Sequence, residues 1–268
     1  MKQLITFFGL SYFISWLIWF PLYGHLIGLN NLPVLPYHHA LGGLGPLLAS
    51  VLTTWIYLKN DGLKRLLKQC FQTKPIIYLL IALFSPFLLA FLAALINNLI
   101  YQTPVNLSAL FVAKEFPDFN IIIFFIYNLI FFGFGEEVGW RGFALPRLQA
   151  KSNALTASII LTFFWAFWHW PLFFYRPSFM AMGIGGAFGW FFSLLTGSIL
   201  LTWIYNSSRA SILMCAIFHA TIDIAFMADF SDQALANTMG FLITVWGILT
   251  IIILKPNNLS VKEREMVS

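Results

Sequence analysis

The stretch Ile76–Tyr101, IIYLLIALFSPFLLAFLAALINNLIY, decides the fold class because it contains no charged residue. It is longer than the roughly 20 apolar residues that an α-helix needs to cross a bilayer. The chain as a whole is also apolar: of its 268 residues, 60% are hydrophobic, 18% are aromatic and 9% are charged, and the mean hydropathy is +0.82. Soluble domains carry about 25% charged residues. The sequence therefore predicts an integral membrane protein with no room for a separate soluble domain.

Hydropathy predicts an all-α polytopic membrane protein, a bundle of about eight transmembrane helices. We expect one integral-membrane domain over residues 1–268, with the motifs described below confined to about 121–228. The expected spans are Leu4 to Tyr23, Ala40 to Leu58, Ile76 to Tyr101, Ile121 to Leu148, Ala154 to Tyr175, Gly185 to Tyr205, Ser211 to Ala228 and Thr238 to Leu254.

Lysine and arginine are distributed unevenly between the loops. Of the 15 basic residues, all but Lys114 and Arg176 fall on one side of the predicted spans. Cytoplasmic loops carry the excess of Lys and Arg, so both termini are predicted to be cytoplasmic in a multi-pass protein of the cell membrane. The net charge of +5 then reflects orientation and not nucleic-acid binding. Residues 255–268 are predicted to form a short, flexible polar tail.

A few ionisable residues lie inside the apolar stretches. Of the ten acidic residues, these are Glu136, Glu137 and Asp223, and they are joined by His169 and His219. A charge at the bilayer centre costs at least about 2.5 to 3.5 kcal/mol, so embedded ionisable residues are functional candidates by default.

The spacing of these residues pairs them locally. Glu137 and Arg141 stand at i, i+4 on one helix face, which predicts a supporting ion pair and leaves Glu136 pointing about 100° away and free. His219 and Asp223 have the same spacing and aim an imidazole and a carboxyl at one spot. Each pair alone is explained by helix packing, but together the embedded groups favour one shared polar site.

Depth along the helices tests the idea of a shared site. At 1.5 Å per residue, Glu136 lies roughly 23 Å from the outer end of its helix and His219 roughly 12 Å from the inner end of its own. Both are then near the middle of the membrane or in its inner half. His169 lies roughly 23 Å from the inner surface, in the outer half of the membrane. A tilt of its helix, an offset start of that helix or a break near Pro171 must therefore bring it to the depth of the other two residues.

At these residues the sequence resembles the CPBP (CAAX protease and bacteriocin-processing, or Abi) family of intramembrane proteases, which includes the type II CAAX prenyl endopeptidase. The family pattern is Glu-Glu-x-x-x-Arg, then Phe-x-x-x-His, then His-x-x-x-Asn or Asp, on a bundle of about eight helices. Trp replaces the usual Phe in the second motif, a change that we expect to affect packing only. The motifs correspond here to Glu136, Glu137 and Arg141, then Trp165 and His169, then His219 and Asp223.

The resemblance implies catalytic roles for four residues. Glu136 would be the general base that activates water, helped by His169, while His219 and Asp223 would hold the oxyanion of the tetrahedral intermediate. An ionised Asp223 would repel that charge, so it must be protonated or orient His219 instead. The substrate would be a peptide or protein, either a leader-type peptide or a lipid-modified chain, held among membrane lipids.

Alternatives remain open from the sequence. We expect no cofactor, but Glu136, His169 and His219 are also acceptable zinc ligands, although the zinc motif His-Glu-x-x-His is missing. Embedded acids and histidines also build proton relays in transporters, against which stands the lack of an inverted repeat. A non-catalytic immunity or scaffold protein is the third possibility.

Overall fold

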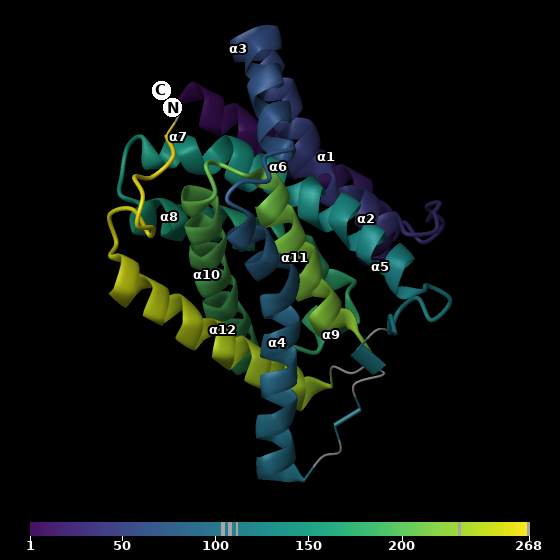
Figure 1. Cartoon of the computed structure of the whole chain (residues 1–268). Coiled ribbons are helices and arrows are strands. Elements are labelled where there is room, and N and C mark those ends of the chain that lie inside the picture. Colours follow the sequence, from purple (N-terminus) through teal and green to yellow (C-terminus); the bar gives the residue numbers. More distant parts are fainter. Residues whose placement is uncertain (103–104, 107–108, 111, 230–231, 267–268) are drawn as a thin grey trace.

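The computed structural model describes residues 1–102, 105–106, 109–110, 112–229 and 232–266. These residues form a bundle of helices (Figure 1), and their only β pairing is an isolated antiparallel bridge between Ala113 and Ala228. The elements are, in chain order, α1 (Lys2–Tyr23), η1 (Gly24–Ile27), α2 (His38–Gly43), α3 (Gly45–Cys70), α4 (Ile76–Tyr101), α5 (Ile121–Asn128), η3 (Leu129–Phe134), α6 (Gly135–Gly139), η4 (Trp140–Ala144), α7 (Leu145–Gln149), α8 (Ala154–Trp168), η5 (Trp170–Phe174), α9 (Pro177–Met180), α10 (Ile184–Ser207), α11 (Ile212–Met227) and α12 (Gln233–Leu254).

Seven helical stretches of the described chain are long and apolar enough to cross a membrane. The predicted fold class, an all-α multi-pass membrane protein, is thereby confirmed. The predicted span Ser211 to Ala228 is not one of the seven. It corresponds to α11, which has 16 residues and is therefore about 24 Å long, whereas the hydrocarbon core of a bilayer is about 30 Å thick. Most of α11 is buried, in contact with α4, η3 and α10, so protein surrounds this short helix. The seven stretches are Lys2–Ile27, His38–Cys70, Ile76–Tyr101, Ile121–Gln149, Ala154–Phe174, Ile184–Ser207 and Gln233–Leu254.

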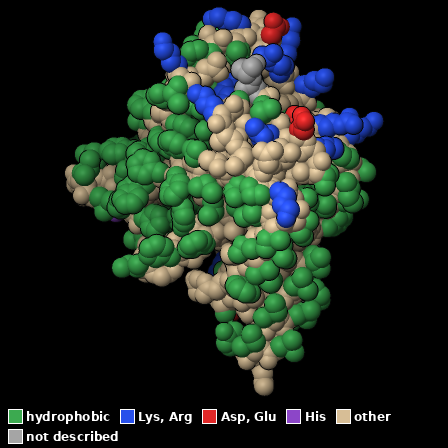
Figure 2. All heavy atoms as spheres, turned by 90° about the vertical axis from the view of Figure 1, so that its left-hand side faces the viewer, with side chains coloured by type: hydrophobic (Ala, Val, Ile, Leu, Met, Phe, Trp, Pro, Cys, Tyr) green, Lys and Arg blue, Asp and Glu red, His purple; other side chains and the backbone are tan. Residues whose placement is uncertain are grey.

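Charged side chains gather at one end of the bundle. Figure 2 shows Lys, Arg, Asp and Glu crowded at the upper end and hydrophobic side chains over most of the remaining visible face. The two chain ends lie near each other towards the same end in Figure 1. Both are held near α7, since Arg147 Nε donates to Gln3 Oε1 (2.8 Å) and Gln149 Nε2 donates to the carbonyl oxygen of Glu265 (2.7 Å). That this end faces the cytoplasm stays a prediction.

The C-terminal tail is tied to the bundle. Gln149 on α7 and Asn206 on α10 exchange two side-chain hydrogen bonds (3.0 and 2.8 Å). Asn206 also donates to the carbonyl oxygen of Asn258 (2.8 Å) and accepts from the backbone N–H of Glu265 (3.1 Å). The prediction of a flexible tail is therefore wrong for this part of it, because its backbone pairs with buried amide side chains of two helices.

Helix α3 continues beyond the predicted end of the second span. The prediction ended that span at Leu58, whereas α3 bends sharply at Lys59 (φ 53°, ψ −151°) and runs on to Cys70. The bend brings Gly62 back against the first half of α3, where a Cβ on Gly62 would lie 2.7 Å from Cγ2 of Thr54. The second half mixes basic and apolar side chains, which is why the predicted span ended before it.

One long helix, Ile121–Gln149, carries the paired glutamates. Two π-helical segments, η3 and η4, flank the short α6 that holds Glu136 and Glu137, and such segments are frequent at functional sites. Glycines let neighbouring backbones approach closely: a Cβ on Gly133 would lie 2.5 Å from the carbonyl oxygen of Ala216 on α11, and one on Gly139 would lie 2.6 Å from that of Pro46 on α3. Small residues at such contacts are typical of packed membrane helices, and here they hold the motif helix between α3 and α11.

Candidate active site

Glu136 is buried, with 3% of its surface exposed, and is held by two indole groups. Its Oε2 accepts a hydrogen bond from Trp165 Nε1 (2.6 Å) on α8 and a longer one from Trp140 Nε1 (3.3 Å), one turn along its own helix. Within the described residues no cation pairs with Glu136, and both hydrogen bonds fall on Oε2. Its second oxygen, Oε1, is therefore the atom left for a reacting molecule.

Glu137 is fully buried and has charged or polar partners on two helices. Its Oε1 accepts from Arg141 Nη1 (2.9 Å) and from His219 Nδ1 (2.7 Å). The i, i+4 neighbours predicted from the sequence are thus in contact, and His219 on α11 joins them from 82 residues away. The two adjacent glutamates have separate surroundings: Glu137 lies in an ion-pair network, whereas Glu136 lies among indole donors.

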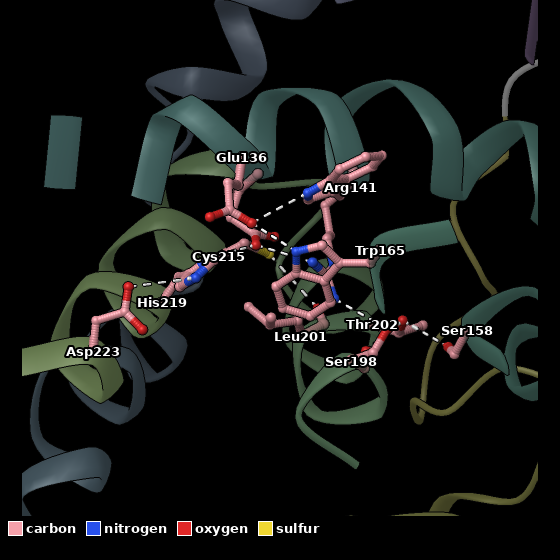
Figure 3. Close-up of polar contacts among 12 residues, drawn as sticks. Glu136, Arg141, Ser158, Trp165, Ser198, Leu201, Thr202, Cys215, His219 and Asp223 are labelled. Atoms are coloured by element: carbon pink, nitrogen blue, oxygen red, sulfur yellow. Dashed lines mark hydrogen bonds and ion pairs between the residues drawn. The ribbon is translucent and has the colours of Figure 1, made fainter. Parts of the chain in front are cut away.

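Arg141 anchors this network to α8 and α10, as Figure 3 shows. Its Nη2 donates to Ser198 Oγ (3.1 Å), and its guanidinium lies 4.5 Å from the ring centroid of Trp165. Behind Ser198, Thr202 donates to the Ser198 carbonyl oxygen (2.9 Å) and Ser158 donates to Thr202 (2.7 Å). Three helices thereby hold the guanidinium in place.

His219 lies between two carboxylates. With Nδ1 donating to Glu137, its Nε2 faces Asp223 Oδ2 at 3.5 Å. That distance is longer than a good hydrogen bond, and Asp223 is the most open member of the cluster, with 28% of its side chain exposed. The predicted His219 and Asp223 pair therefore forms only a loose contact.

Trp165 connects the groups of the site. Besides its hydrogen bond to Glu136, its backbone carbonyl accepts from His169 Nδ1 (2.8 Å), and its ring meets the His219 ring edge-on with centroids 5.6 Å apart. The prediction that Trp at this position affects packing only is wrong, because a Phe side chain has no N–H to donate. The motifs also do not predict the hydrogen bond from Trp140 to Glu136, although the i, i+4 spacing of these two residues indicates that they can be in contact. Ser198 has no local sequence signal.

His169 lies at the end of α8, one turn beyond Trp165. A carbonyl oxygen can only accept, so Nδ1 carries the proton of that hydrogen bond and Nε2 is the acceptor nitrogen of the neutral ring. Its ring packs against Phe179 and Trp190. Within the described residues no hydrogen bond joins His169 to Glu136 or His219. The structure thus brings Glu137, His219 and Asp223 into contact, and it links Glu136 and His169 to them through Trp165.

The residues considered for zinc do not fit a metal centre in this arrangement. Among the described residues, no group of three or more His, Cys, Asp and Glu side chains is arranged to hold a metal ion. His219 Nδ1 is bonded to Glu137, and His169 Nδ1 is bonded to a backbone carbonyl. A metal shared by Glu136, His169 and His219 would require these rings to move.

The part of the chain that matches known proteins is the part that contains the three motifs. Residues 118–225 match the family model described as type II CAAX prenyl endopeptidase Rce1-like. Over these residues the chain is similar to the CAAX proteases of the CPBP family. All three motifs of the CPBP family, from Glu136 to Asp223, lie within the matched segment.

A similar curated protein is "CAAX prenyl protease 2" of Methanococcus maripaludis, which is 33% identical over 121 residues. The match covers 44% of this chain and 42% of that relative, so the chain aligns with less than half of the relative's length. The similarity to this relative therefore concerns less than half of either protein.

Proposed function

We propose that this protein is an intramembrane endopeptidase in which Glu136 activates water to cleave a peptide bond. The observation that carries the proposal is the contrast between two adjacent glutamates. Glu137 is bonded to Arg141 and His219, whereas Glu136 is held only by indole N–H groups and keeps Oε1 unbonded within the described residues. A carboxylate held in place without a cation is suited to accept a proton.

In the proposed reaction, Oε1 of Glu136 takes a proton from a water molecule while the water oxygen attacks the scissile carbonyl carbon. His169 Nε2, whose lone pair is free when Nδ1 is bonded to Trp165, orients that water. The resulting tetrahedral intermediate carries a negative oxygen. When it collapses, the C–N bond breaks and Glu136 returns its proton to the leaving amine, so the base ends the cycle as it began.

His219 is the proposed donor to the oxyanion. Its bond to Glu137 fixes the ring, and the 3.5 Å contact between Nε2 and Asp223 is long enough for an oxyanion to replace it. Asp223 orients His219 only until the oxyanion takes its place at Nε2, and it does not contact the oxyanion itself. Because Nδ1 already donates to Glu137, donation from Nε2 requires a proton on both ring nitrogens. Glu137 and Arg141 are the supporting ion pair.

The proposed substrate is a membrane-associated peptide or protein. The relative from Methanococcus maripaludis is named a CAAX prenyl protease, which makes a farnesylated peptide ending in a CAAX sequence the first substrate to test. A leader-type peptide without a lipid is the alternative, and it uses the same chemistry. We further propose that catalysis needs no bound metal, since the site residues are already bonded to one another.

The decisive variant is Glu136→Gln, which keeps the size of the side chain and removes the base. We expect purified protein in lipid vesicles to cleave the farnesylated peptide and this variant to lose at least about a hundredfold in kcat, because general-base catalysis contributes 10²–10⁴-fold. Glu263→Gln, the same change at an exposed position of the tail, is the control and should cleave normally.

Unbiased peptide analysis extends the test to other substrates. Membranes from cells that make either the wild type or Glu136→Gln are compared by mass spectrometry for peptides that differ. Cleavage unaffected by Glu136→Gln would contradict the proposal. A cellular phenotype retained by Glu136→Gln would favour the scaffold alternative, and solute uptake by vesicles that survives loss of both His169 and His219 would favour the transporter.

A further inference from the structure

A groove lies between the two halves of α3, away from the paired glutamates. Its volume is about 650 Å³. Leu47 and Val51 form one wall from the first half of α3, and Leu63 and Leu67 form the other from the second half. Val51 and Leu67 are 37% and 61% exposed, so the groove opens to the outside of the bundle.

The floor of this groove belongs to the helix that carries the proposed base. Phe134 and Val138 line it, at the junctions between α6 and its flanking π-helical segments. Leu66, which is 7% exposed, closes the groove from the side of α3. A molecule in the groove would therefore touch the back of the segment that presents Glu136.

The groove is apolar along its length and polar where the bend in α3 begins. The polar lining residues are Asn60 and Lys64, both exposed. Arg65 and Lys68 follow on the same half of α3, against a single acid, Asp61. None of these three basic residues forms an ion pair with a described acid, so their charges are available to an anion.

We propose that this groove binds an anionic phospholipid. One acyl chain would lie between Val51 and Leu67, and the phosphate would sit at Lys64 and Asn60. Basic pockets beside transmembrane helices on the cytoplasmic side are suited to anionic headgroups, and basic side chains near the surface attract them. The charge at the mouth selects an anionic lipid over a zwitterionic one, and the apolar walls distinguish a lipid from free phosphate.

The chain contains its own reporter for this site. Cys70 lines the groove and is partly exposed, whereas Cys215, the other cysteine, is completely buried. A maleimide should therefore modify Cys70 alone in the folded protein. A lipid lying in the groove will slow that modification.

The test measures how fast Cys70 is modified in purified protein in detergent, with phosphatidylglycerol or phosphatidylcholine added. We expect phosphatidylglycerol to slow modification severalfold and phosphatidylcholine to have little effect at the same concentration. Native mass spectrometry of the same samples should show one phosphatidylglycerol molecule retained. Lys64→Gln should weaken that retention roughly fivefold, the weight of one basic side chain of about 1 kcal/mol at a membrane surface.

Two further variants test the site of the acyl chain and control for the removal of a positive charge elsewhere. Val51→Phe fills the groove and should abolish protection of Cys70, whereas Lys255→Gln removes an exposed charge at the end of α12 and should leave lipid retention unchanged. Equal protection by both lipids, or equal retention by Lys64→Gln and the wild type, would overturn the proposal. Protection by inorganic phosphate alone, or stronger protection by the farnesylated peptide than by phosphatidylglycerol, would also overturn it.

Discussion

Glu136 and Glu137 show how two identical side chains acquire different chemistry from their neighbours. The sequence predicts the contact between Glu137 and Arg141, because both lie on one turn of one helix. It also identifies which glutamate lacks a cation. It does not predict that His219 donates to Glu137 or that Trp165 donates to Glu136, because these contacts join different helices and depend on how the bundle packs.

The hydrogen bond from Trp165 to Glu136 yields a test of positioning. Replacing Trp165 by Phe keeps an aromatic ring and removes the donor, so Oε2 of Glu136 keeps only the 3.3 Å bond from Trp140. A hydrogen bond to a charged group contributes about 1.5 to 3 kcal/mol, so we expect kcat to fall roughly tenfold to a hundredfold with KM unchanged.

Steady-state cleavage of the farnesylated peptide measures this effect. Trp203→Phe is the matched control, since the ring contacts of Trp203 in the described chain are with Tyr78 and Trp246, which are not motif residues. Unchanged kcat in Trp165→Phe, with normal thermal unfolding, would mean that the indole only packs.

The buried ion pair of Glu137 and Arg141 predicts that losing the arginine destabilises the protein more when Glu137 keeps its charge. Arg141→Met removes the arginine partner of the fully buried Glu137 and leaves it only the bond from His219, and removing one partner of a buried pair costs about 3 to 5 kcal/mol. Adding Glu137→Gln to this variant removes the stranded charge and should recover part of the loss. Thermal unfolding in detergent of the wild type, both single variants and the double variant measures the coupling, and additive losses would contradict it.

At the scale of elements, hydropathy predicts where the membrane helices lie but not how their backbones depart from regular geometry. The predicted span ending at Leu148 corresponds to a helix ending at Gln149, yet the two π-helical segments inside it have no hydropathy signal. The bend at Lys59 is missed for a related reason. Mean hydropathy averages over many residues, whereas a bend or a π segment depends on local contacts with other helices.

The close approach at Gly139 predicts a sharp difference between glycines. A Cβ there would lie 2.6 Å from both Cβ and the carbonyl oxygen of Pro46, whereas Gly189 on α10 has nothing within 4 Å. We expect Gly139→Leu to lower stability by about 1 to 3 kcal/mol or more, since 1 to 3 kcal/mol is the usual cost of overpacking. Gly189→Leu should have little effect. Thermal unfolding of the two variants measures the difference, and equal melting temperatures would contradict the close packing of α6 on α3.

For the whole molecule, the distribution of Lys and Arg predicts which end faces the cytoplasm. The structure gathers charged side chains at one end and brings both chain ends towards it. We expect a membrane-impermeant maleimide added to intact cells to label Asp118→Cys, in the predicted outer loop, and not Glu263→Cys. Both cysteines should react after the cells are opened, and labelling of Glu263→Cys in intact cells would reverse the predicted orientation.

The tethered tail has a consequence for biosynthesis. The first backbone N–H of α8, at Ala154, donates to the carbonyl oxygen of Asn257 (2.9 Å), and Gln149 and Asn206 are bonded to Glu265. Translation proceeds from the N-terminus, so the helices that carry Glu136 and His169 are synthesised well before these partners leave the ribosome. The ends of α7, α8 and α10 can therefore reach their final arrangement only after residue 265 has emerged, which makes closure of this end a late step in assembling the site.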